Sequence, residues 1–253
     1  MGPAILTSLI LLNPESSNMI RFPLSSIPGS SILGSLSLAL TAGLLSLAAQ
    51  NLEAQVTVVP QAGIYAPLSD LGELRDDTGE TLLELGRRES TLAFGATFET
   101  GDPESSAVGV RAGIGFATRS DVPVQGVGCE DCAARSSLLT VGAALVLHPF
   151  PRLALLRPYL VAGGGVAYYD FDDEGLREEG WQNALQDQAQ AQLHLGLGTH
   201  LFLGPLRPRI ELGAHISRFN PSDESITPQG VTGIGEGDRQ ANLFLMVGIP
   251  FGG

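Results

Sequence analysis

The stretches AQAQLHLGLGTHLFL (residues 189–203) and PRIELGAHISRF (residues 208–219) decide the fold. In the first, apolar residues stand at nearly every odd position, and glutamine, histidine or glycine stands at nearly every even one. In the second, isoleucine, leucine and alanine alternate with arginine, glutamate, glycine, histidine and serine. A period of two is the pattern of a β-strand that has one face in apolar surroundings. Both stretches are therefore predicted to be long, two-faced strands.

This alternation recurs in eight stretches of the chain: 55–67, 90–100, 106–118, 137–148, 158–169, 189–203, 208–219 and 240–251. The connections between them alternate between long and short: 68–89, 101–105, 119–136, 149–157, 170–188, 204–207 and 220–239. An even number of strands of about ten residues, with short turns at one end and long loops at the other, is typical of membrane barrels. The sequence therefore predicts an all-β fold, an eight-stranded antiparallel up-and-down transmembrane β-barrel over residues 55–253.

A soluble β-sandwich would share the alternation, but three features favour the membrane. The polar faces carry small residues and charges that can pair, and the long and short connections alternate in a way that a sandwich does not require. Aromatic residues stand at the expected strand ends, as in interfacial girdles: Phe98, Tyr159, Tyr168, Tyr169, Phe219 and Phe251. Pro60 and Pro250 fall in the two strands that must meet when the barrel closes, and we expect a bulge and a strand end there.

Residues 1–54 have a different character. Ile32–Ala49 is an apolar run rich in leucine, alanine and small residues, and Arg21 precedes it. This pattern predicts a secretory signal peptide that is cleaved after residue 54, and a retained helical anchor is the alternative. Met19, followed by isoleucine and arginine, is a better candidate for the true start than Met1.

The chain is acidic, with a formal net charge of −13, and arginine supplies all 14 of its basic residues. It has no basic stripe, which excludes a nucleic-acid partner on electrostatic grounds. Acidic residues gather in two long connections: Asp70, Glu73, Asp76, Asp77, Glu80, Glu84 and Glu89, then Asp170, Asp172, Asp173, Glu174, Glu178, Glu179 and Asp187. We interpret them as a solvated surface that resists aggregation. Cation bridges to lipopolysaccharide phosphates are a second interpretation, although no spacing matches a calcium-binding loop.

Eight strands leave an interior that side chains can fill. The alternation directs a polar network inward: Glu99, Arg111, His194, His200, Arg209, Glu211 and His215, together with Gln61, Gln190 and Gln192. Charges in such a place must pair, because an unpartnered buried charge is costly. The sequence therefore predicts a plugged or very narrow interior.

The segment LRPYLVAGGGV (156–166) resembles the fifth strand of small outer-membrane barrels of the OmpA/OmpX-like kind, and Leu195–Gly198 and Arg209–His215 are similar to their next two strands. The ending MVGIPF (246–251) is similar to their assembly signal, except that Gly252 and Gly253 follow the aromatic residue. The resemblance spans most of residues 55–253. Because the sequence stops at the last expected strand, we expect a barrel without a peptidoglycan-binding domain.

The resemblance also implies a location and partners. It places the protein in the outer membrane of a Gram-negative-type bacterium, as a monomer with periplasmic termini. Outer-membrane lipid, lipopolysaccharide and, during biogenesis, the barrel-assembly machinery would be its partners. Members of this family more often have a structural or surface-interaction role than a catalytic one.

One arrangement is a candidate for catalysis. His215 and Ser217 share a strand face, so that base and nucleophile could meet, and this spacing is similar to the His-x-Ser of outer-membrane lipid A 3-O-deacylases. Glu224 or Glu236 would orient the histidine. That family places asparagine after the serine, where this chain has Arg218. The predicted inward direction of both side chains also favours an interior, non-catalytic role.

Cys129 and Cys132 are the only cysteines. Zinc would need further nearby ligands, so a disulfide in an exported loop is predicted. Trp181, Leu185 and the glutamines from Gln182 to Gln192 indicate a short amphipathic helix. The sequence thus favours a structural or surface-interacting protein without catalysis, cofactor or metal. The alternatives are a lipid A deacylase and a narrow channel or transporter of small apolar ligands.

Overall fold

The computed structural model describes residues 56–100, 106–150, 155–182, 184–203, 207–219, 225–227, 230, 232–237 and 239–251. The predicted leader, residues 1–54, lies outside this part of the chain. No helix of the described residues is long and apolar enough to cross a membrane.

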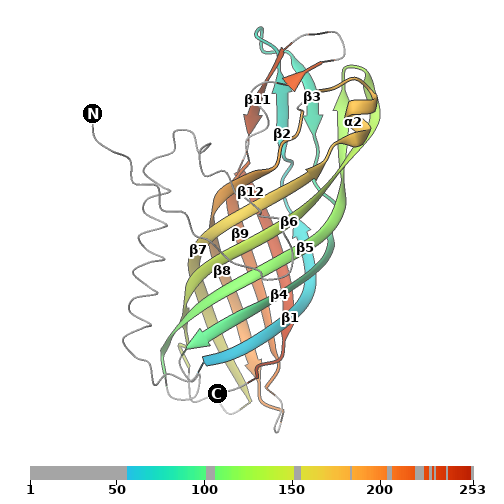
Figure 1. The fold of residues 1–253 in the computed structure, drawn as a ribbon. Coiled ribbons are helices and arrows are strands. Elements are labelled where there is room, and N and C mark those ends of the chain that lie inside the picture. The colour runs from blue at the N-terminus through green and yellow to red at the C-terminus, as the bar shows by residue number, and fades with distance from the viewer. Residues whose placement is uncertain are drawn as a thin grey trace, which may run out of the picture. The chain divides into compact units, whose positions relative to one another are not determined.

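Eight long strands form a closed antiparallel barrel, as the alternation predicts (Figure 1). They are β1 (Val56–Pro67), β4 (Thr91–Thr100), β5 (Val108–Gly126), β6 (Cys129–Leu147), β7 (Leu156–Asp172), β8 (Gln188–Leu201), β9 (Arg209–Arg218) and β12 (Arg239–Gly248). Each strand pairs with its neighbours in chain order, and β1 pairs with both β4 and β12. Closure leaves the barrel without an open edge, which hydrocarbon would not tolerate.

The two prolines lie where the first and last strands meet. The β1–β12 ladder runs from Pro67 to Gln61, and Pro60 stands immediately beyond it. The carbonyl of Pro60 accepts a hydrogen bond from the Ile249 amide at 3.3 Å, and Val58 and Phe251 exchange two backbone hydrogen bonds past the prolines. β12 ends at Gly248, so Pro250 lies just past the strand end, as expected, and the isolated Val58–Phe251 bridge continues the junction beyond it. The expected bulge at Pro60 was wrong, because the pairings of β1 show no register shift there.

The outer face of the barrel is apolar on every strand. Its exposed side chains include Ile64, Leu92, Phe94, Ile114, Phe116, Val141, Leu145, Leu160, Val166, Leu193, Leu195, Leu197, Ile210, Leu212, Leu245 and Val247. Large apolar side chains exposed on all strands of a closed barrel are what a lipid environment requires.

A folded extension continues the barrel at the end opposite the paired residues Val58 and Phe251 (Figure 1). We define the extension as β2 (Gly72–Arg75), β3 (Thr81–Leu85), residues 120–136 of β5 and β6, α2 (Glu174–Glu178) and β11 (Thr232–Gly237). β11 pairs with β2, β2 with β3 and β3 with β5, and the short β10 (Ser225–Ile226) pairs with β11.

The prediction of a long loop over 119–136 was wrong. These residues continue β5 and β6 and are joined by a turn at Val127–Gly128, where Gly128 has a φ of 71°. The pairing shifts register between Ala117 and Ser120. Inward residues change there from odd to even numbers, so that Ser120 and Val122 are buried. Because such a bulge changes which positions face inward, the alternation is interrupted, and the continuing strand cannot be recognised from an unbroken period of two.

The expected helix around Trp181–Gln192 was also wrong. The helix of this segment is α2, and residues from Gln188 onward form β8. Trp181 and Leu185 are buried in one apolar cluster with Leu74, Leu83 and Leu176. This cluster fills the extension and reaches into the adjoining half of the barrel.

Three of the six aromatic residues expected in interfacial girdles point inward instead. Tyr159, Tyr169 and Phe219 are buried, whereas Phe98, Tyr168 and Phe251 are exposed. The three buried rings lie on the same face as the polar network. Tyr159 and Tyr169 have the inward numbering of β7, and Phe219 stands two positions after the inward Ser217 of β9. Position near a strand end therefore did not distinguish an aromatic residue facing lipid from one filling the interior.

Candidate functional site

An ion-pair network fills the interior at the end nearer Val58 and Phe251. Arg111 of β5 contacts Glu99 of β4 at 2.7 Å through Nε, and Glu211 of β9 at 2.5 Å through Nη1. Arg209 pairs with the same Glu99 and donates a hydrogen bond to Thr97 Oγ1 at 2.6 Å. Two carboxylates thus face two guanidinium groups, and the buried charges compensate each other.

Aromatic and histidine rings pack around this network. The Tyr159 hydroxyl donates a hydrogen bond to Glu211 Oε2 at 2.7 Å. Its ring lies against the ring of His200, with centroids 4.9 Å apart, and His148 packs beside both. A Cβ added to Gly198 would come within 2.4 Å of the Tyr159 ring, so only glycine admits the tyrosine there. Sequence reasoning missed His148, although the alternation of β6 places it on the face of Ala144 and Val146.

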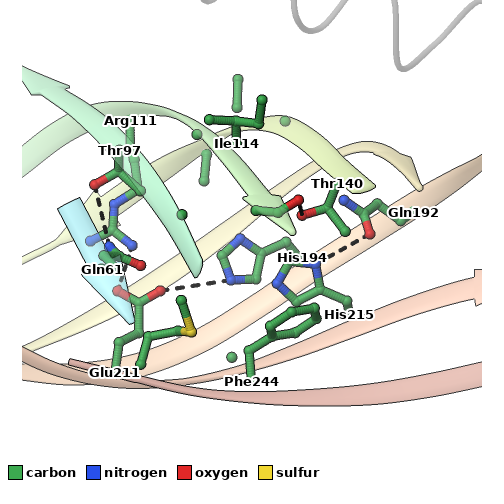
Figure 2. Close-up of a pocket in the computed structure, with 18 of the residues that line it drawn as sticks. Gln61, Thr97, Arg111, Ile114, Thr140, Gln192, His194, Glu211, His215 and Phe244 are labelled. Atoms are coloured by element: carbon green, nitrogen blue, oxygen red, sulfur yellow. Dashed lines mark hydrogen bonds and ion pairs between the residues drawn. The ribbon is translucent and has the colours of Figure 1, made fainter. Parts of the chain in front are cut away.

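A cavity of about 80 Å³ lies beside the network (Figure 2). Water needs about 10–15 Å³ of such space, so the cavity has room for a few molecules. Its polar lining comes chiefly from Arg111, Gln192, His194, Glu211 and His215. The remainder of the wall is built largely from small residues: Gly95, Gly113, Gly115, Gly142, Ala143, Ala144 and Gly164. The cavity exists because glycine and alanine on one side of the interior have no side chains large enough to fill it.

The two histidines of the cavity lie face to face. His194 of β8 and His215 of β9 are partners in the ladder, and their ring centroids are 4.2 Å apart. His215 Nδ1 lies 3.2 Å from Gln192 Oε1, and His194 Nε2 lies 3.9 Å from Glu211 Oε1 (Figure 2). The structure thus brings His194, Glu211 and His215 together around the cavity, while His200 lies apart from it, against Tyr159.

A belt of neutral polar groups and one arginine crosses the interior between the cavity and the extension. Arg88 is 2% exposed and donates hydrogen bonds to Tyr65 Oη at 3.2 Å and to the Ser136 carbonyl at 2.7 Å. Tyr65 donates to Asn242 Oδ1, and Asn242 donates to Tyr169 Oη. Sequence reasoning missed this belt, because Arg88 belongs to a segment that was predicted to be a solvated loop.

The candidate catalytic pair is not assembled as a base and a nucleophile. Ser217 is 6% exposed, and its hydroxyl lies 3.2 Å from Tyr169 Oη. His215 makes its hydrogen bond with Gln192 instead. Both side chains face the interior, away from the lipid side from which an acyl ester would approach. Glu224 lies outside the described residues, and Glu236 stands in β11 of the extension.

The sulfurs of Cys129 and Cys132 are bonded, as predicted. Both residues belong to β6, directly after the turn at the tip of the extension, and not to a loop. Within the described ranges, no three His, Cys, Asp or Glu side chains are grouped closely enough to hold a metal ion.

The fold is similar to that of solved outer-membrane proteins. No protein-family model matches the sequence, and a search of curated proteins finds no significant match. Among solved structures, the outer-membrane protein OprG from Pseudomonas aeruginosa is 18% identical, with a TM-score of 0.56 over 78% of this chain and 96% of OprG. The outer-membrane protein AlkL is 18% identical, with a TM-score of 0.43 over 79% of this chain and 90% of its own.

The outer-membrane protease OmpT from Escherichia coli is 9% identical, with a TM-score of 0.47 over 79% of this chain and 97% of its own. At such identities the likeness concerns the fold alone.

Proposed function

We propose that this chain, which has the fold of the small eight-stranded outer-membrane β-barrels, is a non-catalytic and non-conducting protein of the outer membrane. In this proposal it presents a folded, acidic extension to the outside of the cell. The observation that carries the proposal is an interior closed at three successive levels.

The first level is the network of Arg111, Arg209, Glu99 and Glu211, whose charges compensate each other. The second is the belt around Arg88, and the third is the apolar cluster that continues into the extension. Between the first two levels lies a cavity of about 80 Å³. Ligand sites usually measure 300–1,000 Å³, so neither a diffusion pore nor a path for larger apolar ligands has support here.

The orientation of the barrel in the membrane is inferred from the ends at which the short connections and the folded extension lie. Val58 and Phe251 meet at one end of the barrel, where few residues of the sequence separate β4 from β5, β6 from β7 and β8 from β9, and the extension stands at the other end. Outer-membrane barrels have short periplasmic turns and longer extracellular loops. The proposal therefore places the termini in the periplasm and the acidic residues of the extension outside, facing lipopolysaccharide. The protein would act as a monomer, inserted into the membrane by the barrel-assembly machinery.

Planar-bilayer recording tests the closed interior. The mature protein should insert without unitary current steps, and flotation of the same protein with vesicles should verify insertion. Steps whose size changes in Arg111→Ala would place a conducting path through the interior and overturn the proposal. Arg119→Ala is the matched control, because Arg119 is half-exposed on β5, one residue before the extension begins, and pairs with Asp170 and Asp172.

Orientation has its own experiment. An epitope inserted after Gly79, in the exposed turn between β2 and β3, should bind antibody on intact cells. An epitope at the C-terminus should bind only after the outer membrane is permeabilised. The reverse result would overturn the orientation and leave the closed interior untouched.

The lipid A deacylase alternative retains only the His-x-Ser spacing in its favour. Release of 3-hydroxy fatty acid from lipid A should be equal for the unchanged protein, for Ser217→Ala and for an unrelated barrel. Release that is present in the unchanged protein and lost in Ser217→Ala would make the chain an enzyme.

A further inference from the structure

Two arginines stand opposite each other where the outer face of the barrel meets the extension. Arg218 ends β9, Arg239 begins β12, and the two are direct partners in the ladder between these strands. Both are exposed, whereas the adjacent Ser217 and Gln240 are buried. The alternation of each strand therefore directs both guanidinium groups outward, at the end of the barrel that carries the extension (Figure 1). We call Arg218 and Arg239 the rim pair.

The rim pair lacks the counter-charge that other exposed arginines have. Arg119 pairs with Asp170 and Asp172, and Arg135 pairs with Asp121. Among the residues that the structure describes, neither arginine of the rim pair forms an ion pair. Side chains directly opposite on a sheet face have Cβ atoms about 4.5–5.5 Å apart, and like charges there destabilise the sheet. Such a pair is suited to an anion that comes from outside the chain.

Asp70 is the charged neighbour on the β1 side of the rim pair. Its carbonyl accepts a hydrogen bond from the side-chain amide of Gln240, so its backbone lies beside the start of β12. Its exposed carboxylate forms no ion pair with Arg239 within the described part of the chain. An external anion at the rim pair therefore displaces water and not a carboxylate that is already bound.

Below the rim pair, the outer face becomes apolar at the next outward position, where Ala241 stands opposite Ile216. From Ile210 to Arg218, β9 covers about 20 Å along the barrel axis, at about 3.4 Å per residue and a tilt of about 40°. The apolar band of such barrels is about 25 Å tall, so the rim pair lies at its margin, at the level of lipid headgroups. A ligand that contacts both surfaces combines an anionic head with acyl chains.

We infer that the rim pair binds a phosphate group of lipid A, whose acyl chains lie against the apolar face below it. The planar guanidinium fork of arginine matches phosphate oxygens bidentately. A phosphomonoester carries a charge of about −1.5 to −2 near pH 7 and three acceptor oxygens, so one group can neutralise both arginines. The choice of lipid A rests on the proposed orientation, which places this end of the barrel in the outer leaflet.

Native mass spectrometry of the complete mature barrel in non-ionic detergent measures lipid binding as a mass adduct. Diphosphorylated lipid A should form a one-to-one adduct. Dephosphorylated lipid A should bind more than about tenfold more weakly, because the charge-assisted hydrogen bonds to phosphate are lost. Phosphatidylglycerol, with a singly charged phosphodiester, should also bind more weakly, and inorganic phosphate should not displace lipid A. Equal binding of either comparison lipid, or displacement by inorganic phosphate, would overturn the proposal.

A double variant tests the arginines themselves. Arg218→Gln combined with Arg239→Gln should weaken binding of diphosphorylated lipid A by more than about tenfold. Arg119→Gln combined with Arg135→Gln is the matched control, since it removes the same charge from arginines that already have carboxylate partners. This control should bind lipid A normally at about 0.15 M salt, where distant exposed charges are screened. Equal loss in the two double variants would contradict a defined site; heat-modified gel mobility verifies that each is folded.

The stability of a single variant should change sign with the lipid. In lipid-free detergent, Arg218→Gln should raise the ratio of folded to unfolded protein by about 1.4- to 5-fold, because it relieves the repulsion within the rim pair. With diphosphorylated lipid A present, the unchanged protein should be the more stable one, since a ligand of the folded state stabilises it. Equal stabilisation of both proteins by the lipid would contradict the proposal.

These measurements in detergent do not depend on how the barrel is oriented in the cell. Their failure would overturn lipid binding by the rim pair and leave the closed interior and the orientation untouched. An epitope after Gly79 that binds antibody only in permeabilised cells would instead overturn the orientation. The choice of lipid A would then fall with the orientation, whatever the adduct measurements showed.

Discussion

Arg111 and Glu211 stand 100 residues apart in the chain and meet inside the barrel, where Arg111 Nη1 lies 2.5 Å from Glu211 Oε2. The same guanidinium holds Glu99 at 2.7 Å, so that one arginine of β5 joins the neighbouring strand β4 to β9 across the interior. Its side chain is 3% exposed. Removing one partner of such a buried pair leaves an uncompensated charge in the interior, which is strongly destabilising.

Arg111→Met should lower the free energy of unfolding by about 3–5 kcal/mol, because two buried carboxylates then share Arg209 alone. Urea titration of the refolded protein in detergent measures the loss. Arg119→Met is the control, since the half-exposed Arg119 pairs should contribute less than about 1 kcal/mol. Equal losses in the two variants would contradict a stabilising role for the network.

Leu195→Arg should lower the stability of the inserted barrel by about 2–4 kcal/mol, the cost of arginine on the lipid face near the bilayer centre. Leu195 is 44% exposed and lies mid-strand between Ala162 and Ala214. Reversible unfolding from lipid vesicles measures the change. Val127→Arg should change the stability little, because Val127 is exposed at the tip of the extension. If both variants lost the same stability, the outer face would not be in lipid.

Leu83→Ala should destabilise the extension by about 2–5 kcal/mol while the barrel remains folded. Leu83 is fully buried in the apolar cluster of the extension. Limited proteolysis of protein in vesicles should release fragments of the extension from this variant faster than from Val127→Ala. Heat-modified gel mobility should stay unchanged in both variants, because the membrane-spanning ladder does not depend on Leu83.

The turn between β2 and β3 should loosen in acid. Hydrogen bonds from the Thr78 hydroxyl and from the Glu80 and Thr78 amides lower the pKa of Asp76 from its ordinary value of 3.8. A carboxylate with a lowered folded pKa stabilises the turn above its unfolded pKa, and that stability is lost as the pH falls through the folded pKa.

Amide hydrogen exchange at Thr78 and Glu80 measures this loss. Protection should be constant near neutral pH and should decline as the pH falls below 3.8. Asp76→Asn should lack part of the protection already at neutral pH. Asp77→Asn is the neighbouring control and should follow the unchanged protein.

The strands and their faces were predictable because each inward side chain stands two positions from the next. Arg209, Glu211, His215 and Ser217 were assigned to one face on this basis, and the structure places all four inside. The prediction failed where the period breaks. Because the strand register shifts after Ala117, the continuing β5–β6 hairpin was predicted to be a loop. The inward-facing tyrosines were predicted to be girdle residues because they stand near strand ends.

By itself, the sequence determined that the chain forms eight barrel strands with an apolar outer face. Both properties follow from the alternation of residue types within each strand, which is local in sequence. Only the tertiary structure decided which side chains meet. Strand tilt and register bring Arg111 to Glu211, stack His194 on His215 over Gly213, and carry Arg88 from an apparent loop into the interior. Those contacts join distant segments, and a period of two specifies a face without specifying the neighbour across the barrel.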